Sequence, residues 1–298
     1  MNLLKHFLKP LLLLMLLSGQ YVVAEPTADG QLLDIVRETS ESLPGYNIYR
    51  PADLQAVADP LPIIAWGNGA CARFDQVWRP IIERFAAHGY LVMSVAQVPL
   101  PTSGGNSQAE GVRTMSRMTA DDQQTAIDWA IAQNTAAGGP YKGHLDTNRI
   151  VAAGNSCGGI ISLALAGKDP RVKAIFILSG SSIGPGATRE QAAEVMNKVT
   201  VPVGYVVGGP EDIARDQADQ DYDLLAKGLA SMVVKRAEGD HRAVSTTPDI
   251  QIRAADIGNI WLKATLFGNK EAIKVLAGDT PCAICDPKVW TIKTKNLH

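Results

Sequence analysis

The sequence predicts an α/β fold in which a mostly parallel β-sheet carries helices on both faces. Short apolar runs typical of buried strands alternate with segments whose apolar residues recur at helical spacing, and no internal repeat interrupts the alternation. The composition agrees with this class. With 46% hydrophobic and 19% charged residues among 298, it suits a compact domain and excludes coiled-coil, collagen-like and disordered chains.

The N-terminal segment has the pattern of a secretory signal peptide. A basic region with Lys5, His6 and Lys9 precedes an apolar run at 11–17, and small residues precede a cleavage site after Ala24. Seven apolar residues are too few to cross about 30 Å of hydrocarbon as a helix, which disfavours the alternative of an uncleaved membrane anchor. We therefore expect an exported protein, secreted or periplasmic.

Cleavage would leave a single α/β domain in residues 25–298. The formal charge of the whole chain is −2, from 28 Lys and Arg against 30 Asp and Glu. Removing Lys5 and Lys9 leaves 26 against 30, a charge of −4. Because no run of like charges forms a phosphate-binding stripe, nucleic acid is not an expected partner, and no membrane insertion is expected after signal cleavage.

The expected strands are apolar or β-branched runs that end at turn residues. In chain order they are residues 46–50, 62–66, 90–95, 149–153, 172–178, 201–207 and 232–235. Helices are expected where apolar residues recur at three- and four-residue spacing. These are the segments 77–85, 120–134, 160–165, 191–199 and 250–268. The tail after Gly268 is predicted to be irregular.

A Gly-x-Ser-x-Gly motif around Ser156 lies between a predicted strand and a helix that is apolar nearly all round and therefore buried. In this arrangement the serine lies on a tight turn with its hydroxyl exposed above the sheet, and the flanking glycines permit the strained backbone. A second match at 180–184 runs into Pro185-Gly186 instead of a helix, so we interpret it as a loop. Ser156 is the predicted nucleophile, and a glycine-rich packing turn is the alternative.

A serine nucleophile needs a base, and histidine is matched to neutral pH. His241 directly follows the last predicted strand, which would hold it at the same sheet edge as Ser156. The other histidines are poorer candidates. His6 lies in the signal segment and His298 is the last residue, while His88 and His144 are predicted at the edge of the sheet opposite to Ser156. We predict His241 as the general base, with a surface histidine as the alternative.

The base in turn needs a carboxylate that fixes its tautomer, and in the strand–turn–helix class this acid lies between the serine and the histidine in sequence. Asp212 follows the strand 201–207, so its loop is expected at the catalytic edge. Its neighbour Glu211 is the alternative, disfavoured because Asp is the commoner partner and because Glu211 follows the rigid Pro210.

Acyl transfer also needs hydrogen-bond donors for the oxyanion. Two backbone N–H groups are predicted for this role. One belongs to Cys157, at the positive end of the buried helix, and the other to Asn68, in the glycine-rich turn after the strand 62–66. For Asn68, an ordinary tight turn is the alternative.

Four blocks in chain order, WGNGAC, GNSCGG, GGPEDIA and GDH, resemble the oxyanion turn, nucleophile elbow, acid loop and histidine loop of the α/β-hydrolase superfamily. Among its members they are similar to single-domain serine esterases of the cutinase-like, polyester-hydrolase-like and dienelactone-hydrolase-like groups. The resemblance implies a mostly parallel eight-stranded sheet and a triad of Ser156, Asp212 and His241 that works through an acyl-enzyme. The interval 180–201 is short, so we expect little or no lid.

An oxidising compartment would allow the four cysteines to form two disulfides, with three possible pairings. Cys71 follows the oxyanion turn and Cys157 follows the nucleophile, and both loops must meet over the reacting carbonyl. We predict that these two are bonded and that Cys282 and Cys285 close a small loop, with free thiols as the alternative. A metal site is not expected, because a single C-x-x-C pair lacks further zinc ligands.

The sequence therefore predicts a serine esterase that cleaves small-molecule or polymeric carboxylic esters without a cofactor. Two alternatives remain open. One is a peptidase or amidase that uses the same triad, and the other is a catalytically silent relative that serves as a binding module. The presence of a nucleophile, a base, a carboxylate and oxyanion donors argues against a catalytically silent relative.

Overall fold

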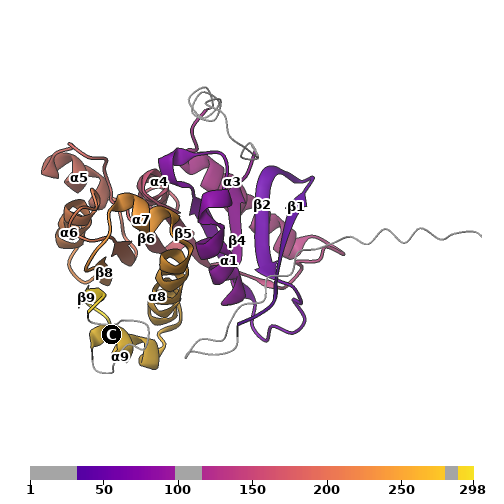
Figure 1. Ribbon diagram of the computed structural model, residues 1–298. Helices are drawn as coiled ribbons and strands as arrows, with labels where there is room; N and C mark the ends of the chain where they lie inside the picture. The colour runs from indigo at the N-terminus through magenta and orange to yellow at the C-terminus, as the bar shows by residue number, and fades with distance from the viewer. Residues whose placement is uncertain (1–31, 98–115, 279–287) are drawn as a thin grey trace, which may run out of the picture.

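The computed structural model describes residues 32–97, 116–278 and 288–298 (Figure 1). The predicted signal peptide and the pair Cys282 and Cys285 lie outside these residues. Within the described part of the chain, no helix is long and apolar enough to cross a membrane.

A single nine-stranded sheet forms the centre of the described structure, in the order β1-β2-β4-β3-β5-β6-β7-β8-β9. The strands from β4 to β8 pair in parallel, whereas β1, β2 and β9 are antiparallel to their neighbours. The strands are β1 (Ile35–Ser40), β2 (Leu43–Pro51), β3 (Leu61–Gly67), β4 (Leu91–Val95), β5 (Leu145–Asn155), β6 (Val172–Leu178), β7 (Val203–Val207), β8 (Ser231–Arg236) and β9 (Trp290–Lys295). The predicted mostly parallel sheet is confirmed.

Helices cover both faces of this sheet, as predicted. The α-helices are α1 (Arg79–Ala87), α3 (Ala120–Thr135), α4 (Cys157–Ala166), α5 (Arg189–Met196), α6 (Arg215–Leu224), α7 (His241–Thr246), α8 (Pro248–Phe267) and α9 (Lys270–Ala277). Two short 3-10 helices, η1 (Gly69–Cys71) and η2 (Gln76–Trp78), follow β3. The small helix expected in the interval 180–201 is α5.

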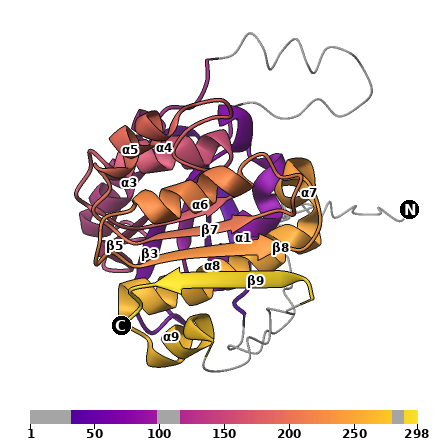
Figure 2. The ribbon, with the colours of Figure 1, turned by 90° about the vertical axis from the view of Figure 1, so that its left-hand side faces the viewer.

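Two separate hydrophobic cores result from the period-two alternation of the strands. Along β3, Ile63 and Ala65 face the core under α3, α4, α5 and α6, while Ile64 and Trp66 face the core under α1, α7, α8 and α9. Figure 2 shows α4 and α5 on one side of the strands and α9 on the other. Because the central strands are buried on both faces, they are continuous apolar runs, which made them recognisable in the sequence.

The prediction of eight strands and an irregular tail is wrong. The sheet has nine strands, and both edge strands, β1 and β9, lie outside the predicted strand segments. The tail contains α9 and β9, and β9 pairs with β8 to become an edge strand of the sheet. In β9 the buried Trp290 alternates with polar residues such as Lys293 and Lys295. Lysines are typical of edge strands, where they oppose further pairing, but in a sequence they are equally typical of a solvated tail.

The contact between β7 and α8 depends on Gly204. A Cβ at this position would lie 2.7 Å from Nε1 of Trp261, whose indole is fully buried and donates a hydrogen bond to the carbonyl of Ile175. We expect Gly204→Ala to lower the free energy of unfolding by about 1–3 kcal/mol, because the indole has no room to move. Chemical denaturation measures this loss. Gly139→Ala is the matched control, since its Cβ would make only ordinary contacts, and equal stability of the two variants would contradict the packing argument.

Candidate active site

The turn between β5 and α4 presents Ser156 at the carboxyl edge of the sheet. Its backbone is strained, with φ 51° and ψ −116°, in the region expected for the serine of this motif. The flanking glycines are required by space. A Cβ on Gly158 would lie 1.9 Å from the carbonyl oxygen of Gly67, and one on Gly154 would lie 2.5 Å from the backbone of Gly158. The turn therefore crosses the end of β3 with no room for side chains.

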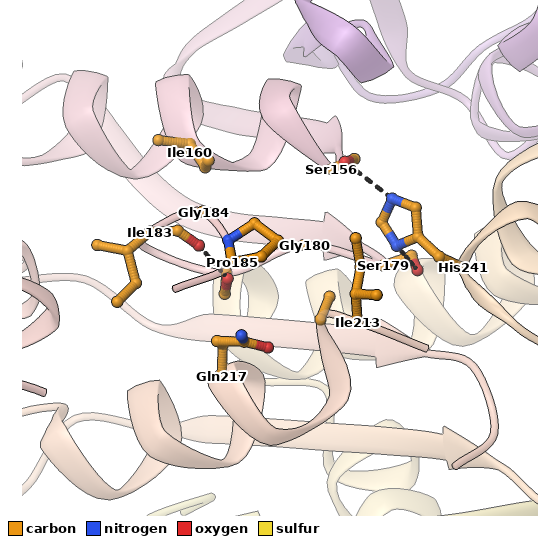
Figure 3. Close-up of a pocket in the computed structure, with 12 residues that line it drawn as sticks. Ser156, Ile160, Ser179, Gly180, Ile183, Gly184, Pro185, Ile213, Gln217 and His241 are labelled. Atoms are coloured by element: carbon orange, nitrogen blue, oxygen red, sulfur yellow. Dashed lines mark hydrogen bonds between the residues drawn. The ribbon is translucent and has the colours of Figure 1, made fainter. Parts of the chain in front are cut away.

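Three of the predicted residues form one hydrogen-bonded series. Nε2 of His241 lies 2.9 Å from Oγ of Ser156 (Figure 3). Nδ1 of His241 lies 2.8 Å from Oδ1 of Asp212. A carboxylate only accepts hydrogen bonds, so Nδ1 carries the proton and Nε2 of the neutral ring accepts from the serine hydroxyl. Asp212 follows β7 and His241 begins α7. The alternative acid, Glu211, is exposed and makes no described contact with the imidazole.

The Asp212 carboxylate is buried but well supplied with donors. It accepts hydrogen bonds from His241, from the hydroxyl of Ser179 and from the backbone N–H groups of Gly208 and Ala214, the last two at 2.7 and 3.0 Å. Burial alone would raise the pKa of Asp212, yet these hydrogen bonds outweigh it and lower the pKa below its ordinary value. The group is therefore an anion at neutral pH.

Ser179 is a site residue that the sequence analysis missed. Its hydroxyl donates to Oδ2 of Asp212 and lies 3.0 Å from Nδ1 of His241. It occupies the left-handed region with φ 44°, immediately after β6. A polar residue that directly follows a buried apolar strand was the available signal. It was overlooked because Ser179 belongs to no recognised motif.

The two residues predicted as sources of oxyanion donors belong to neighbouring segments, the turn after β3 and the start of α4. Cys157 is the first residue of α4, where the backbone N–H groups have no partner within the helix. Asn68 follows β3 and is fully buried, and its side chain donates to the carbonyls of Ala72 and Val95. These contacts fix the turn that carries the Asn68 N–H.

A disulfide joins Cys71 to Cys157, with the Cα atoms 5.2 Å apart, which confirms the predicted pairing. Ala70 and Cys71 both have positive φ, at 54° and 50°, so the turn after β3 is held in an unfavourable conformation. The disulfide ties this turn to the first residue of α4. The two predicted donor positions are therefore linked covalently.

A pocket opens beside Ser156, and its lining is almost entirely apolar or small (Figure 3). One wall is the loop after β6, another is the start of α6, and Ile160 of α4 closes a third side. The lining residues are Ser156, Ile160, Ser179, Gly180, Ser181, Ile183, Gly184, Pro185, Ile213, Ala214, Gln217 and His241. None of these carries a carboxylate or a permanently charged side chain.

The loop wall of this pocket is anchored by the buried carboxylate of Asp221 on α6. Asp221 accepts hydrogen bonds from the backbone N–H and the hydroxyl of Ser182, at 2.6 and 2.5 Å, and from the hydroxyl of Tyr205 at 3.1 Å. Burial raises the pKa of Asp221 to about 6, against the opposing effect of these hydrogen bonds. Ser182 belongs to the second Gly-x-Ser-x-Gly match, which lies in a loop as predicted.

No metal centre is apparent in the described part of the chain. Among residues 32–97, 116–278 and 288–298, no three His, Cys, Asp or Glu side chains are grouped so that they could hold a metal ion. His88, which the sequence predicts to lie at the wrong end of its βαβ unit, contacts Asp256 at 2.8 Å. Burial lowers the pKa of His88 despite this carboxylate, so it packs as a neutral side chain.

The disulfide is expected to contribute to stability, because it closes a loop with a sequence separation of 86 residues. Replacing both Cys71 and Cys157 by serine should lower the free energy of unfolding by about 2–4 kcal/mol. Denaturant titration measures the change. Reducing agent should destabilise the wild type by a similar amount and the double variant far less, because only the small loop predicted between Cys282 and Cys285 would remain to be opened. An unchanged unfolding midpoint in the double variant would contradict this role.

Asp221 should make stability depend on pH. In the unfolded chain its pKa is about 3.9, so between about pH 4 and pH 6 the unfolded state releases a proton that the folded state keeps, and stability falls as pH rises. Asp221→Asn lacks this titration. As pH rises through this window, the unfolding free energy of Asp221→Asn should therefore increase by about 2–3 kcal/mol relative to that of the wild type. Denaturation at pH 4, 5, 6 and 7 measures this change. The exposed Asp216→Asn is the control, and a pH-independent difference for Asp221→Asn would refute the assignment.

Comparison with known proteins identifies the family. The family model described as X-Pro dipeptidyl-peptidase (S15 family) matches residues 45–262, from β2 into α8. No curated protein matches the chain. The α/β-hydrolase superfamily predicted from the motif blocks is confirmed, whereas the match does not support the cutinase-like, polyester-hydrolase-like or dienelactone-hydrolase-like groups. The chain belongs to the S15 family of serine hydrolases, within the α/β-hydrolase superfamily.

Proposed function

We propose that this protein hydrolyses carboxylic esters through an acyl-enzyme formed on Ser156. The observation that carries the proposal is the hydrogen-bonded series from Ser156 through His241 to Asp212, placed beside a pocket whose described lining has no charged group to bind a charged substrate. In this proposal His241 is the general base and then the general acid, and Asp212 is the orienting carboxylate.

In the acylation step, Oγ of Ser156 attacks the ester carbonyl while its proton moves to Nε2 of His241. The carbonyl oxygen becomes an oxyanion, for which the backbone N–H groups of Asn68 and Cys157 are the proposed donors. When the tetrahedral intermediate collapses, Nε2 returns the proton to the departing alcohol oxygen. Water then attacks the acyl-enzyme carbonyl while Nε2 of His241 takes its proton. Collapse of this second intermediate releases the acid, and Nε2 returns the proton to Oγ of Ser156.

The electrostatic arrangement supports this cycle. Asp212 is an anion at neutral pH and contacts Nδ1 of His241, so it stabilises the positive charge that forms on the imidazole after proton transfer. The hydroxyl of Ser179 donates to the other carboxylate oxygen and keeps it in place. The proposed steps use only side chains and backbone groups of this chain and need neither a metal nor a cofactor.

A peptidase is the second candidate, and the family match is what favours it. A dipeptidyl-peptidase removes two residues from a free N-terminus, so its substrate carries an ammonium group near the scissile bond. Such a group needs a carboxylate partner in a water-poor site. The residues described as lining the pocket supply none, which is why we place neutral esters first.

Export of the protein is also part of the proposal. The signal-peptide pattern of residues 1–24 supports it, and so does the disulfide between Cys71 and Cys157, since disulfides persist in oxidising compartments. We propose that a single domain, residues 25–298, acts in the periplasm or outside the cell. Its partner is then a small or polymeric ester, with no role for nucleic acid or membrane insertion.

Matched substrates and variants test the reaction. We expect the wild type to release p-nitrophenol from p-nitrophenyl butyrate with a much larger kcat/KM than it shows for p-nitroaniline release from Gly-Pro-p-nitroanilide. Ser156→Ala and His241→Ala should each lower ester kcat by about 10⁴-fold or more, because triad members act as a unit. His144→Ala, at a histidine far from the site, should leave the activity unchanged.

Each contrary result selects an alternative. A larger kcat/KM for the anilide would favour the peptidase. Release of neither product by a folded wild type would favour the silent binding module. Equal ester activity in the wild type and Ser156→Ala would remove Ser156 from the mechanism.

A further inference from the structure

Gln217 lines the pocket beside Ser156 and carries a buried polar atom that no described residue pairs. Its side-chain Oε1 is buried and has no hydrogen-bond partner among the described residues. Of the described side chains with such an atom, Gln217 is the one that lines the pocket. Figure 3 shows its amide across the pocket from Ile160, below Ile183 and Pro185. Buried polar atoms in native proteins are nearly always paired, so an unpaired one in a binding pocket points to a ligand that completes it.

The described residues that line the pocket around Gln217 form no hydrogen bond with its Oε1. Pro185 has no backbone N–H, and the side chains of Ile183 and Ile213 are apolar. The hydroxyl of Ser181, on the loop wall of the pocket, donates to the carbonyl of Ile183 at 2.7 Å. Within the described part of the chain, the pocket wall therefore holds a hydrogen-bond acceptor without a partner, which a donor on an incoming molecule would complete.

The position of Gln217 is fixed by its helix. It lies four residues before Asp221, and Asp221 ties α6 to the loop wall through Ser182. Residues four apart lie on the same face of a helix, so Gln217 faces the same loop, one turn nearer to Asp212. The acceptor is therefore held at a set place relative to Ser156 instead of on a mobile surface side chain.

We propose that Gln217 determines specificity by accepting a hydrogen bond from an O–H or N–H group on the substrate. The pocket would then take an acyl or alcohol group that is apolar apart from one neutral donor, such as a hydroxyl. A cation is a poorer fit, because the described lining offers no carboxylate. This inference rests on the proposed esterase function and adds the substrate class to it.

Pairs of esters that differ only by a hydroxyl in place of a methyl group test the proposal. Ethyl 3-hydroxybutanoate against ethyl 3-methylbutanoate probes the acyl side, and 2-hydroxyethyl butanoate against propyl butanoate probes the alcohol side. For at least one pair, Gln217→Leu should reduce the wild-type preference for the hydroxylated ester by about tenfold in kcat/KM, the size of one neutral hydrogen bond. Gln220→Leu, the same substitution one helix face away and outside the pocket, should leave both preferences unchanged.

A merely structural role for Gln217 predicts different results. Because Oε1 has no partner among the described residues, Gln217→Leu should leave the thermal midpoint unchanged or higher, whereas loss of a structural hydrogen bond would make it fall. Ethyl 3-oxobutanoate offers an acceptor and no donor, so its kcat/KM should be the same in the wild type and in Gln217→Leu when each is compared with that for ethyl 3-methylbutanoate. Unchanged preferences for both pairs, or an equal gain for the oxo ester, would overturn the proposal.

Binding separates failure of this inference from failure of the esterase proposal. The four esters can be titrated onto Ser156→Ala by NMR, with and without Gln217→Leu, so that no turnover is needed. A hydroxyl preference that depends on Gln217 in binding supports the inference even if the wild type hydrolyses none of them. Hydrolysis of all four with no such dependence in rate or binding would reject the inference and leave the esterase in place.

Discussion

The close crossing of two backbones, at Gly67 and Gly158, is the constraint on which the rest of the site depends. A single added Cβ at Gly158 would lie 1.9 Å from the carbonyl of Gly67, so the end of β3 and the start of α4 are in main-chain contact. This contact brings the turn of Asn68 next to Ser156, and the disulfide between Cys71 and Cys157 fastens the same two segments. The proposed oxyanion donors are thus positioned by the backbone and not by flexible side chains.

Two buried carboxylates near α6 show how surroundings decide charge. Asp212 receives enough hydrogen bonds to stay ionised, and its pKa is lowered, whereas the hydrogen bonds to Asp221 do not offset its burial, and its pKa is raised to about 6. The first is suited to stabilise a positive imidazole. The second holds the loop wall of the pocket. Gln217 lies between them in sequence, and its side-chain Oε1 is a neutral acceptor with no partner among the described residues.

The sequence predicted the central strands and the position of Ser156 because both depend on short-range signals. A strand buried on both faces is apolar throughout, and a strand followed by Gly-x-Ser-x-Gly and an apolar helix is a local pattern. The same reasoning failed for β9, whose strand conformation depends on pairing with the distant β8. It also missed Ser179, whose partners Asp212 and His241 come from other loops.

The sequence by itself determined the order of the motifs, the elbow at Ser156 and a short list of bases and acids, because turn residues after apolar strands fix where such side chains emerge. Only the tertiary structure decided between Glu211 and Asp212 as the residue that contacts His241, and only it showed that Oε1 of Gln217 has no partner among the described residues. Hydrogen-bond partners come from segments far apart in the chain. Whether a polar atom is satisfied is therefore a property of the packed molecule, which no local pattern contains.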